Sequence, residues 1–398
     1  MYRNQKSDFL FIVHHQPDYN LLFNITFDDQ FNITSMKIHH FLTFILSMIS
    51  MALFAQTLKP GFDKEEYLEM LRITQYQIDT PFKKLTVPQP LHHRLEYRSP
   101  VVGMKNRWDL WTNGKNDAVI SIRGSVGDML SWLENGYAAM VPAQGSLKIA
   151  DDYTFDYHLS DNPRASVHTG WLTGLAFLSR DILFRLDSCI GSGMKQFYLV
   201  GHSQGGAINY MLTAYLYDLR KKGRIPADVK FKTYCSAAPK PGNLYFAYDY
   251  EYMTRNGWAF NVVNSVDWVP EVPFSIQTNQ DFNAVNPFTD AKKMIKKQKF
   301  PINILLGMMY SQLMNPPVKA VKNYKKNLGK RAHKMINRSI PSFQMPSYVD
   351  NCNYVRTGTT ILLYADADYA ALFLDSKTNI FCHHFIEPYY YLAQKSDY

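Results

Sequence analysis

The segment YLVGHSQGGAINYMLTAYLYDLRKK, residues 198–222, decides the fold. Its apolar start is typical of a buried strand, and the apolar residues that follow, spaced three and four apart, predict a helix. Ser203 lies between Gly201 and Gly205, where the strand turns into the helix. A nucleophile on so sharp a turn takes a strained backbone conformation, and side chains at the two glycine positions would collide with the neighbouring strand and helix. The pattern therefore predicts a reactive serine projecting from the end of a strand.

Strand-like and helical segments alternate along the rest of the chain. Apolar spacing predicts helices at 63–76, 171–188 and 204–222, and short apolar runs predict strands at 196–200, 229–238, 259–266 and 359–365. Before residue 125, a run in which apolar and polar residues alternate contains Asn113 and Gly114, a turn pair that predicts a β-hairpin. This order predicts an α/β fold, with a mostly parallel sheet flanked by helices.

A serine hydroxyl needs a general base, and in folds with this turn the chain order is serine, acid, histidine. Of the twelve histidines, three follow Ser203, namely His333, His383 and His384. His333 lies in a strongly basic segment, so we expect it to be exposed. The other two lie on a turn before the final helix, and we favour His384 as the base, with His383 as the alternative.

The acid that orients the histidine is expected just after a buried strand. Asp267 has this position, and Pro270 and Pro273 prevent a long helix from following it. Asp366 and Asp368 are rivals, which we expect instead in a solvated turn. The sequence therefore favours Asp267.

Several segments together resemble the class 3, or fungal-type, triacylglycerol lipases of the α/β-hydrolase fold. The resemblance covers residues 106–273 and 359–394. The similar segments, in chain order, are ISIRGS (120–125), SVHTGWL (166–172), the Ser203 turn, SAAPKPGN (236–243) and NSVDWVPEVP (264–273).

The resemblance implies a catalytic machinery without a cofactor or a metal. It implies that Ser125 and the backbone N–H of Gln204 bind the oxyanion, and that the triad is Ser203, Asp267 and His384. It further implies scaffold roles for Arg123 and His168. An apolar lid is implied at residues 126–145, where a fixed core helix is the alternative.

Positive charge is concentrated in one part of the chain. The net charge is +9, and residues 291–338 contain thirteen Lys or Arg and no Asp or Glu. These residues fall within a helical insertion, 276–350, between Asp267 and His384. It either docks on an anionic lipid surface or is a solvated face. No nucleic-acid binding motif accompanies the charge, so we expect no nucleic-acid partner.

The N-terminal part predicts export. Residues 36–55 form a signal-peptide pattern that begins at Met36 and Lys37, which makes 1–35 an upstream extension and Met36 the expected start. An uncleaved membrane anchor at 38–55 is the alternative. Residues 56–398 are expected to form a single domain. Its four cysteines have no zinc-ligand spacing, and Cys352 and Cys382 could pair after export.

We therefore expect an exported serine hydrolase that cleaves carboxylic esters of lipids, with acylglycerols as the favoured substrates, through an acyl-enzyme. A phospholipase A1 or a broad carboxylesterase is the nearest alternative, because the serine turn says nothing about the acyl or alcohol part. A non-catalytic membrane-associated module that retains the fold is a remote one. The sequence does not define the oligomeric state.

Overall fold

The computed structural model describes residues 58–77 and 87–398. They belong to one compact unit, Gln56–Tyr398. The expected signal peptide at 36–55 lies outside the described residues. Within the described ranges, no helix is both long and apolar enough to cross a membrane.

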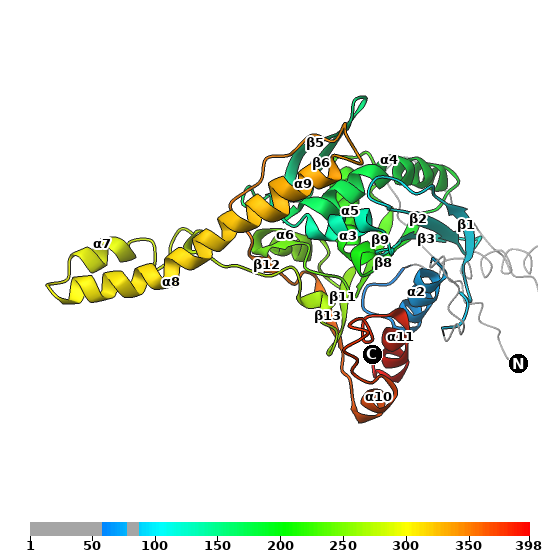
Figure 1. Ribbon diagram of the computed structural model, residues 1–398. Coiled ribbons are helices and arrows are strands. Elements are labelled where there is room, and N and C mark those ends of the chain that lie inside the picture. The colour runs from blue at the N-terminus through cyan, green and yellow to red at the C-terminus, as the bar shows by residue number, and fades with distance from the viewer. Residues whose placement is uncertain (1–57, 78–86) are drawn as a thin grey trace, which may run out of the picture. The chain divides into compact units, whose positions relative to one another are not determined.

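A seven-stranded sheet forms the centre of the unit (Figure 1). Its strands, in spatial order, are β1 (Arg94–Arg98), β2 (Trp108–Thr112), β3 (Asp117–Ile122), β8 (Gln196–His202), β9 (Lys230–Ser236), β11 (Ala259–Asn264) and β13 (Thr359–Leu363). The five strands from β3 to β13 are parallel, and the hairpin of β2 and β3 turns at Asn113 and Gly114. The predicted fold class is confirmed.

Helices cover both faces of this sheet because its strands are apolar on both sides. On one face, α4 (Thr169–Gly191) and α5 (Gln204–Lys221) pack against side chains such as Ile120 and Ile122. On the other, α2 (Lys64–Tyr76) and α11 (Ile386–Lys395) pack against Val119. Successive residues of β3 thus point into opposite cores. The expected apolar face of α2 is buried.

Smaller elements complete the unit. A four-stranded antiparallel sheet contains β12 (Tyr354–Val355), β10 (Gly242–Asn243), β7 (Ser166–His168) and β4 (Met140–Pro142). The remaining elements are the hairpin of β5 (Gln144–Ala150) and β6 (Tyr153–His158) and the helices α3 (Met129–Gly136), α6 (Leu244–Met253) and α10 (Ala367–Leu372).

The insertion is helical, as expected. After α7 (Ala291–Lys296), a continuous helix consists of α8 (Ile302–Tyr324), a π-helical segment (Lys325–Arg331) and α9 (Ala332–Ile336). Figure 1 shows α7 beside the far end of α8, away from the central sheet. We call residues 291–313 the arm.

The C-terminal end of this long helix is buried, which corrects one expectation. His333 is only 6% exposed, and its Nδ1 lies 3.2 Å from the hydroxyl of Tyr137. The backbone N–H of Ala139 also donates to the carbonyl of Leu328 at 3.0 Å. The expectation that His333 is exposed was wrong, because the basic segment ends beneath the chain that follows α3.

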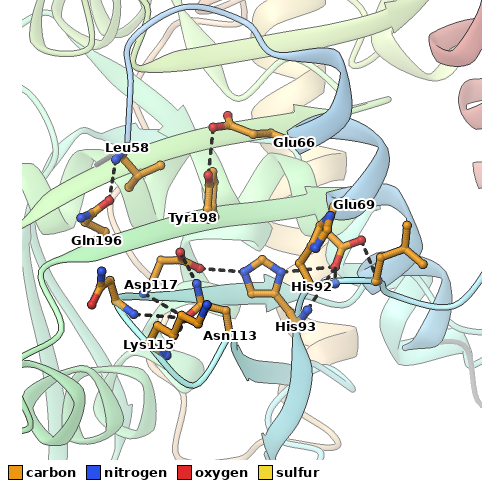
Figure 2. Close-up of polar contacts among 12 residues, drawn as sticks. Leu58, Glu66, Glu69, His92, His93, Asn113, Lys115, Asp117, Gln196 and Tyr198 are labelled. Atoms are coloured by element: carbon orange, nitrogen blue, oxygen red, sulfur yellow. Dashed lines mark hydrogen bonds and ion pairs between the residues drawn. The ribbon is translucent and has the colours of Figure 1, made fainter. Parts of the chain in front are cut away.

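A buried ionic cluster joins α2 to the N-terminal end of β3 (Figure 2). The His93 ring bridges two carboxylates, with Nδ1 3.3 Å from Glu69 Oε1 and Nε2 2.8 Å from Asp117 Oδ1. Burial lowers the pKa of His93, but the bonds to Asp117 and Glu69 outweigh this and raise it to about 9. Burial raises the pKa of Glu69, but bonds from His93 and two backbone N–H groups outweigh this and lower it to about 2.

Candidate active site

Ser203 occupies the turn between β8 and α5 with φ 60° and ψ −129°, a conformation that side-chain-bearing residues rarely adopt. The flanking glycines allow the backbone to approach closely. A Cβ at Gly201 would lie 2.3 Å from the carbonyl carbon of Gly205, and a Cβ at Gly205 would lie 2.2 Å from the carbonyl oxygen of Ile122. The turn therefore depends on glycine at both positions, and its serine projects from the sheet at the start of α5.

Asp267 and His384 are brought together from positions 117 residues apart. His384 Nδ1 lies 2.7 Å from Asp267 Oδ2, and both side chains are buried. The other carboxylate oxygen accepts the backbone N–H of Val269 at 3.0 Å. The hydroxyl of Tyr389, on α11, donates to Asp267 Oδ2 at 2.8 Å. This arrangement fixes the imidazole with Nδ1 protonated, which leaves Nε2 free to accept a proton.

His202 holds His384 beside the serine turn. The Nε2 of His202 donates to the backbone carbonyl of His384 at 2.6 Å, and its Nδ1 lies 3.1 Å from Ser236 Oγ. The two imidazole ring centroids are 5.0 Å apart. Burial lowers the pKa of His202 to about 3, so its ring is neutral. His202 is thus a buried, neutral ring that packs against His384.

The rival residues have other partners. The Nε2 of His383 lies 2.8 Å from Asp375, and its Nδ1 lies 2.9 Å from the hydroxyl of Tyr369. Asp366 caps α10, and Asp368 forms an ion pair with Lys395 at 2.8 Å. The structure therefore pairs Asp267 with His384, whereas His383, Asp366 and Asp368 bond to other groups.

Ser125 lies beside the first residue of α5. Its Oγ donates to the side-chain oxygen of Gln204 at 2.7 Å and accepts from Asn135 Nδ2 at 2.9 Å. A Cβ at Gly124 would lie 2.9 Å from the carbonyl of His202, so the chain passes tightly over the serine turn. The backbone N–H of Gln204 lies in the first turn of α5, where N–H groups have no partner within the helix. The N–H of Gln204 is thus a donor next to Ser203, and the Ser125 hydroxyl becomes a second one when its single proton turns from the Gln204 side chain towards a substrate.

The expected lid segment divides into a buried and an exposed part. In α3, Met129 is 72% and Trp132 is 45% exposed, whereas Tyr137 and Met140 beyond the helix belong to the core. The ring of Trp132 lies 5.8 Å from that of Phe381, between centroids. The ring of Phe381 in turn lies 5.8 Å from that of His384 and 5.4 Å from that of Trp268. Aromatic side chains thus connect α3 to the histidine.

Arg123 and His168 are scaffold residues. His168 caps α4 by accepting the backbone N–H of Trp171 at 3.3 Å, and its Nε2 donates to the carbonyl of Asn135 at 3.1 Å. Burial lowers the pKa of His168 to about 3. Arg123 donates to the carbonyl of Lys105 at 2.9 Å.

Sequence reasoning missed Tyr389 and Asn135, which bond to Asp267 and Ser125. Their signals were weak, since Tyr389 is one of three consecutive tyrosines and Asn135 lies in a segment considered only as an apolar lid. No group of three or more His, Cys, Asp or Glu that could hold a metal ion occurs in the described part of the chain. Cys352 and Cys382 are both free, as are the other two cysteines.

Parallel strands β8 and β11 bring the Ser203 turn and Asp267 to the same edge of the sheet, an arrangement of the α/β-hydrolase class. Residues 119–277 match the model of the family described as Lipase (class 3). The resemblance to class 3 lipases is thus confirmed over this segment, and the chain is a carboxylic ester hydrolase. No curated protein matches the sequence.

Solved lipase structures also resemble the chain, at low identity. A triacylglyceride lipase from Rhizomucor miehei is 16% identical with a TM-score of 0.39, covering 54% of this chain and 77% of that one. A lipase from Yarrowia lipolytica is 17% identical with a TM-score of 0.38, and the match covers 55% of this chain and 77% of that lipase. A triacylglycerol lipase from Penicillium expansum is 14% identical with a TM-score of 0.38, and the match covers 53% of this chain and 74% of that lipase.

Proposed function

We propose that the chain is an exported triacylglycerol lipase that acts through an acyl-enzyme on Ser203. The observation that carries this proposal is the Asp267–His384 pair beside a serine turn that only glycine can flank. Such a pair activates a hydroxyl that is otherwise a weak nucleophile.

In the proposed reaction, Ser203 Oγ attacks the ester carbonyl while His384 Nε2 takes the hydroxyl proton. The carbonyl oxygen becomes negative and is bound by the N–H of Gln204 and by the Ser125 hydroxyl, which turns its proton from the Gln204 side chain to the substrate. The C–O bond to the alcohol then breaks, and His384 returns the proton to the leaving oxygen. A water molecule repeats the sequence on the acyl-enzyme and releases the fatty acid.

Apolar surroundings favour a lipid acyl chain. Trp132, Phe381 and Trp268 form a ring cluster beside His384. A phospholipase A1 or a broad carboxylesterase remains the nearest alternative, because these rings contact an acyl chain whatever alcohol it is esterified to. A non-catalytic role is disfavoured by the complete set of Ser203, Asp267 and His384.

The substrate class is tested by hydrolysis of p-nitrophenyl esters from acetate to palmitate, emulsified triolein and phosphatidylcholine, with a Ser203→Ala control. The proposal predicts that the chain cleaves long-chain esters and triolein and that the variant cleaves neither. Faster cleavage of phosphatidylcholine than of triolein would assign a phospholipase instead. Equal hydrolysis by the chain and the variant would contradict the role of Ser203.

Export is proposed from residues 36–55. N-terminal sequencing of the protein made by its own cells tests it. A mature N-terminus just after residue 55 in the medium or at the cell surface is the expected result. A product that retains residues 1–35 would contradict both the start at Met36 and the cleavage.

We also propose that the arm contacts an anionic membrane surface. The exposed large apolar residues of α8 within it are Ile302, Ile304, Leu305, Leu306, Met308, Met309 and Leu313. These positions surround the helix, and a helix that is apolar on all sides is normally covered by protein or lipid. Phe300, just before α8, is 79% exposed.

The charge beside this apolar helix favours lipid as the occupant. Exposed lysines at 292, 293, 296, 297 and 299 lie on or next to α7, and no acidic residue occurs between 291 and 338. A second copy of the same basic arm would be repelled, whereas an anionic lipid surface attracts each lysine by about 1 kcal/mol. Apolar insertion and lysine contacts together provide two signals for membrane binding.

A further inference from the structure

Glu134, in the last turn of α3, is a fully buried carboxylic acid close to the candidate active site. Its Oε2 accepts from Asn106 Nδ2 at 2.7 Å. Its Oε1 lies against α4, where a Cβ at Gly174 would come within 2.2 Å of it, and has no hydrogen-bond partner among the described residues. A Cβ at Gly170 would lie 2.0 Å from the backbone carbonyl of Glu134. Two glycines of α4 thus make room for this acid.

The buried side chain of Gln204 connects this acid to the oxyanion residues. Its oxygen accepts from Ser125 Oγ at 2.7 Å and from Ser131 Oγ at 3.3 Å. Gln204 also interacts with the Glu134 carboxyl, where it favours the ionised form. The backbone N–H of the same residue is one of the two proposed oxyanion donors. A change of charge at Glu134 therefore acts directly behind the oxyanion site.

The surroundings of Glu134 favour the neutral acid at neutral pH. Burial raises its pKa to about 8, against the lowering effect of Asn106 and Gln204. A buried carboxylate without a cationic partner is unfavourable, so the group remains protonated instead.

Charged groups on the adjoining elements do not replace that missing partner. Lys105 and Asp128 pair with each other at 3.2 Å, and the neutral ring of His168 caps α4. Arg107 donates to the carbonyl of Gln77 at 2.6 Å, and Arg123 to that of Lys105. Both arginines stay charged throughout the pH range in which lipases are assayed.

We propose that Glu134 is a positioning residue whose neutral form is required for oxyanion binding by Ser125 and Gln204. Neutral Glu134 leaves the side-chain oxygen of Gln204 beside Ser125, where it positions the serine until the hydroxyl turns its proton towards the oxyanion. Ionised Glu134 attracts the amide of Gln204 and places a negative charge behind a site that must accept another one, which opposes the transition state. This inference rests on the proposed function, because it assumes an oxyanion on the Ser203 reaction path.

The test is the pH dependence of kcat/KM with p-nitrophenyl butyrate for the chain and for Glu134→Gln, which has the same shape and cannot ionise. The wild-type value should fall as pH rises through about 8. Between pH 7 and pH 9.5 the loss should be about tenfold or more, and Glu134→Gln should lack most of it. An equal alkaline loss in both proteins, or none in the wild type, would overturn the proposal.

Asn106→Ala provides a second test if Glu134→Gln does not fold. This change removes a donor that favours ionised Glu134, so the alkaline loss should move to higher pH. An unchanged midpoint would contradict the proposal. Circular dichroism over the same pH range separates inactivation from unfolding.

Ser203→Ala tests the proposed function separately. Loss of hydrolysis in that variant, together with an unchanged alkaline limb in Glu134→Gln, would contradict the role of Glu134 alone. Full activity in Ser203→Ala would contradict the proposed function itself.

Discussion

Tyr389 and Asp267 share a buried hydrogen bond of 2.8 Å that ends on the same carboxylate oxygen as His384 Nδ1. The tyrosine comes from the last helix, so α11 contributes to the orientation of the acid. Each partner of Asp267 fixes one direction of the carboxylate, and the carboxylate in turn fixes the imidazole. The activity should therefore depend on groups that never touch the substrate.

Asp267→Asn should lower kcat by about four orders of magnitude, because the amide can hold the imidazole in the wrong tautomer. The measurement is kcat with p-nitrophenyl butyrate. Asp366→Asn is a suitable control, since Asp366 caps α10 and should change kcat little. A larger loss in Asp366→Asn than in Asp267→Asn would contradict the assignment of the acid.

His384→Gln should abolish most of the activity, whereas His383→Gln should retain it. The reason is that His384 bonds to Asp267, while His383 bonds to Asp375 and Tyr369. Rates of ester hydrolysis for the two variants decide between them. Retention of activity in His384→Gln would make His383 the base.

Ser125→Ala should lower kcat by about two to three orders of magnitude, because one oxyanion donor is lost. The KM should change much less, since the donor acts on the negative oxygen of the transition state. Steady-state kinetics separate the two effects. Wild-type kcat in Ser125→Ala would rule out this hydroxyl as an oxyanion donor.

Gly205→Ala should destabilise the fold by about 3 kcal/mol or prevent folding, because the new methyl group would overlap the carbonyl of Ile122. Gly191→Ala is the matched control, since nothing lies within 4 Å of a Cβ at that position. Urea unfolding measures both free energies. Equal stability of the two variants would contradict the tight turn at Ser203.

The His93 cluster predicts a pH dependence of stability. His93 has a raised pKa of about 9, so its contribution is complete below its unfolded pKa of about 6.5 and is lost as pH rises through about 9. Glu69 has a lowered pKa of about 2, so its contribution is present above about 4.5 and is lost as pH falls through about 2. His93→Gln should thus lower the free energy of unfolding by about 3 kcal/mol at pH 6 and by less at pH 9.5. Equal destabilisation at both pH values would contradict the charged His93.

A triple variant should bind phosphatidylserine vesicles about 100-fold more weakly, because each arm lysine contributes about 1 kcal/mol. Its three substitutions are Lys292→Gln, Lys296→Gln and Lys297→Gln. The exposed residues Lys115 and Lys377 lie outside the arm, and their double Gln variant provides the control. Vesicle co-sedimentation at fixed ionic strength measures the binding. Equal binding of the wild type to phosphatidylserine and phosphatidylcholine vesicles, or self-association through the arm without vesicle binding, would contradict the lipid contact.

Local patterns in the sequence were sufficient to predict the sheet, the serine turn and the hairpin. Strand runs, helical spacing and paired glycines are read within a few residues, and the structure places them as predicted. The burial of His333 was not predictable in this way, because Tyr137 covers it from almost two hundred residues away. The burial of Glu134 was equally unpredictable from the sequence, since it depends on glycines in a different helix.

The central claim is that Ser203 forms the acyl-enzyme, and active-site labelling tests it most directly. The chain would be treated with p-nitrophenyl hexylphosphonate, digested and analysed by peptide mass spectrometry. We predict one phosphonate adduct, on Ser203 within residues 198–222, with activity lost in proportion to labelling and no adduct in Ser203→Ala. Labelling of a different residue, or full activity after complete labelling of Ser203, would contradict the account.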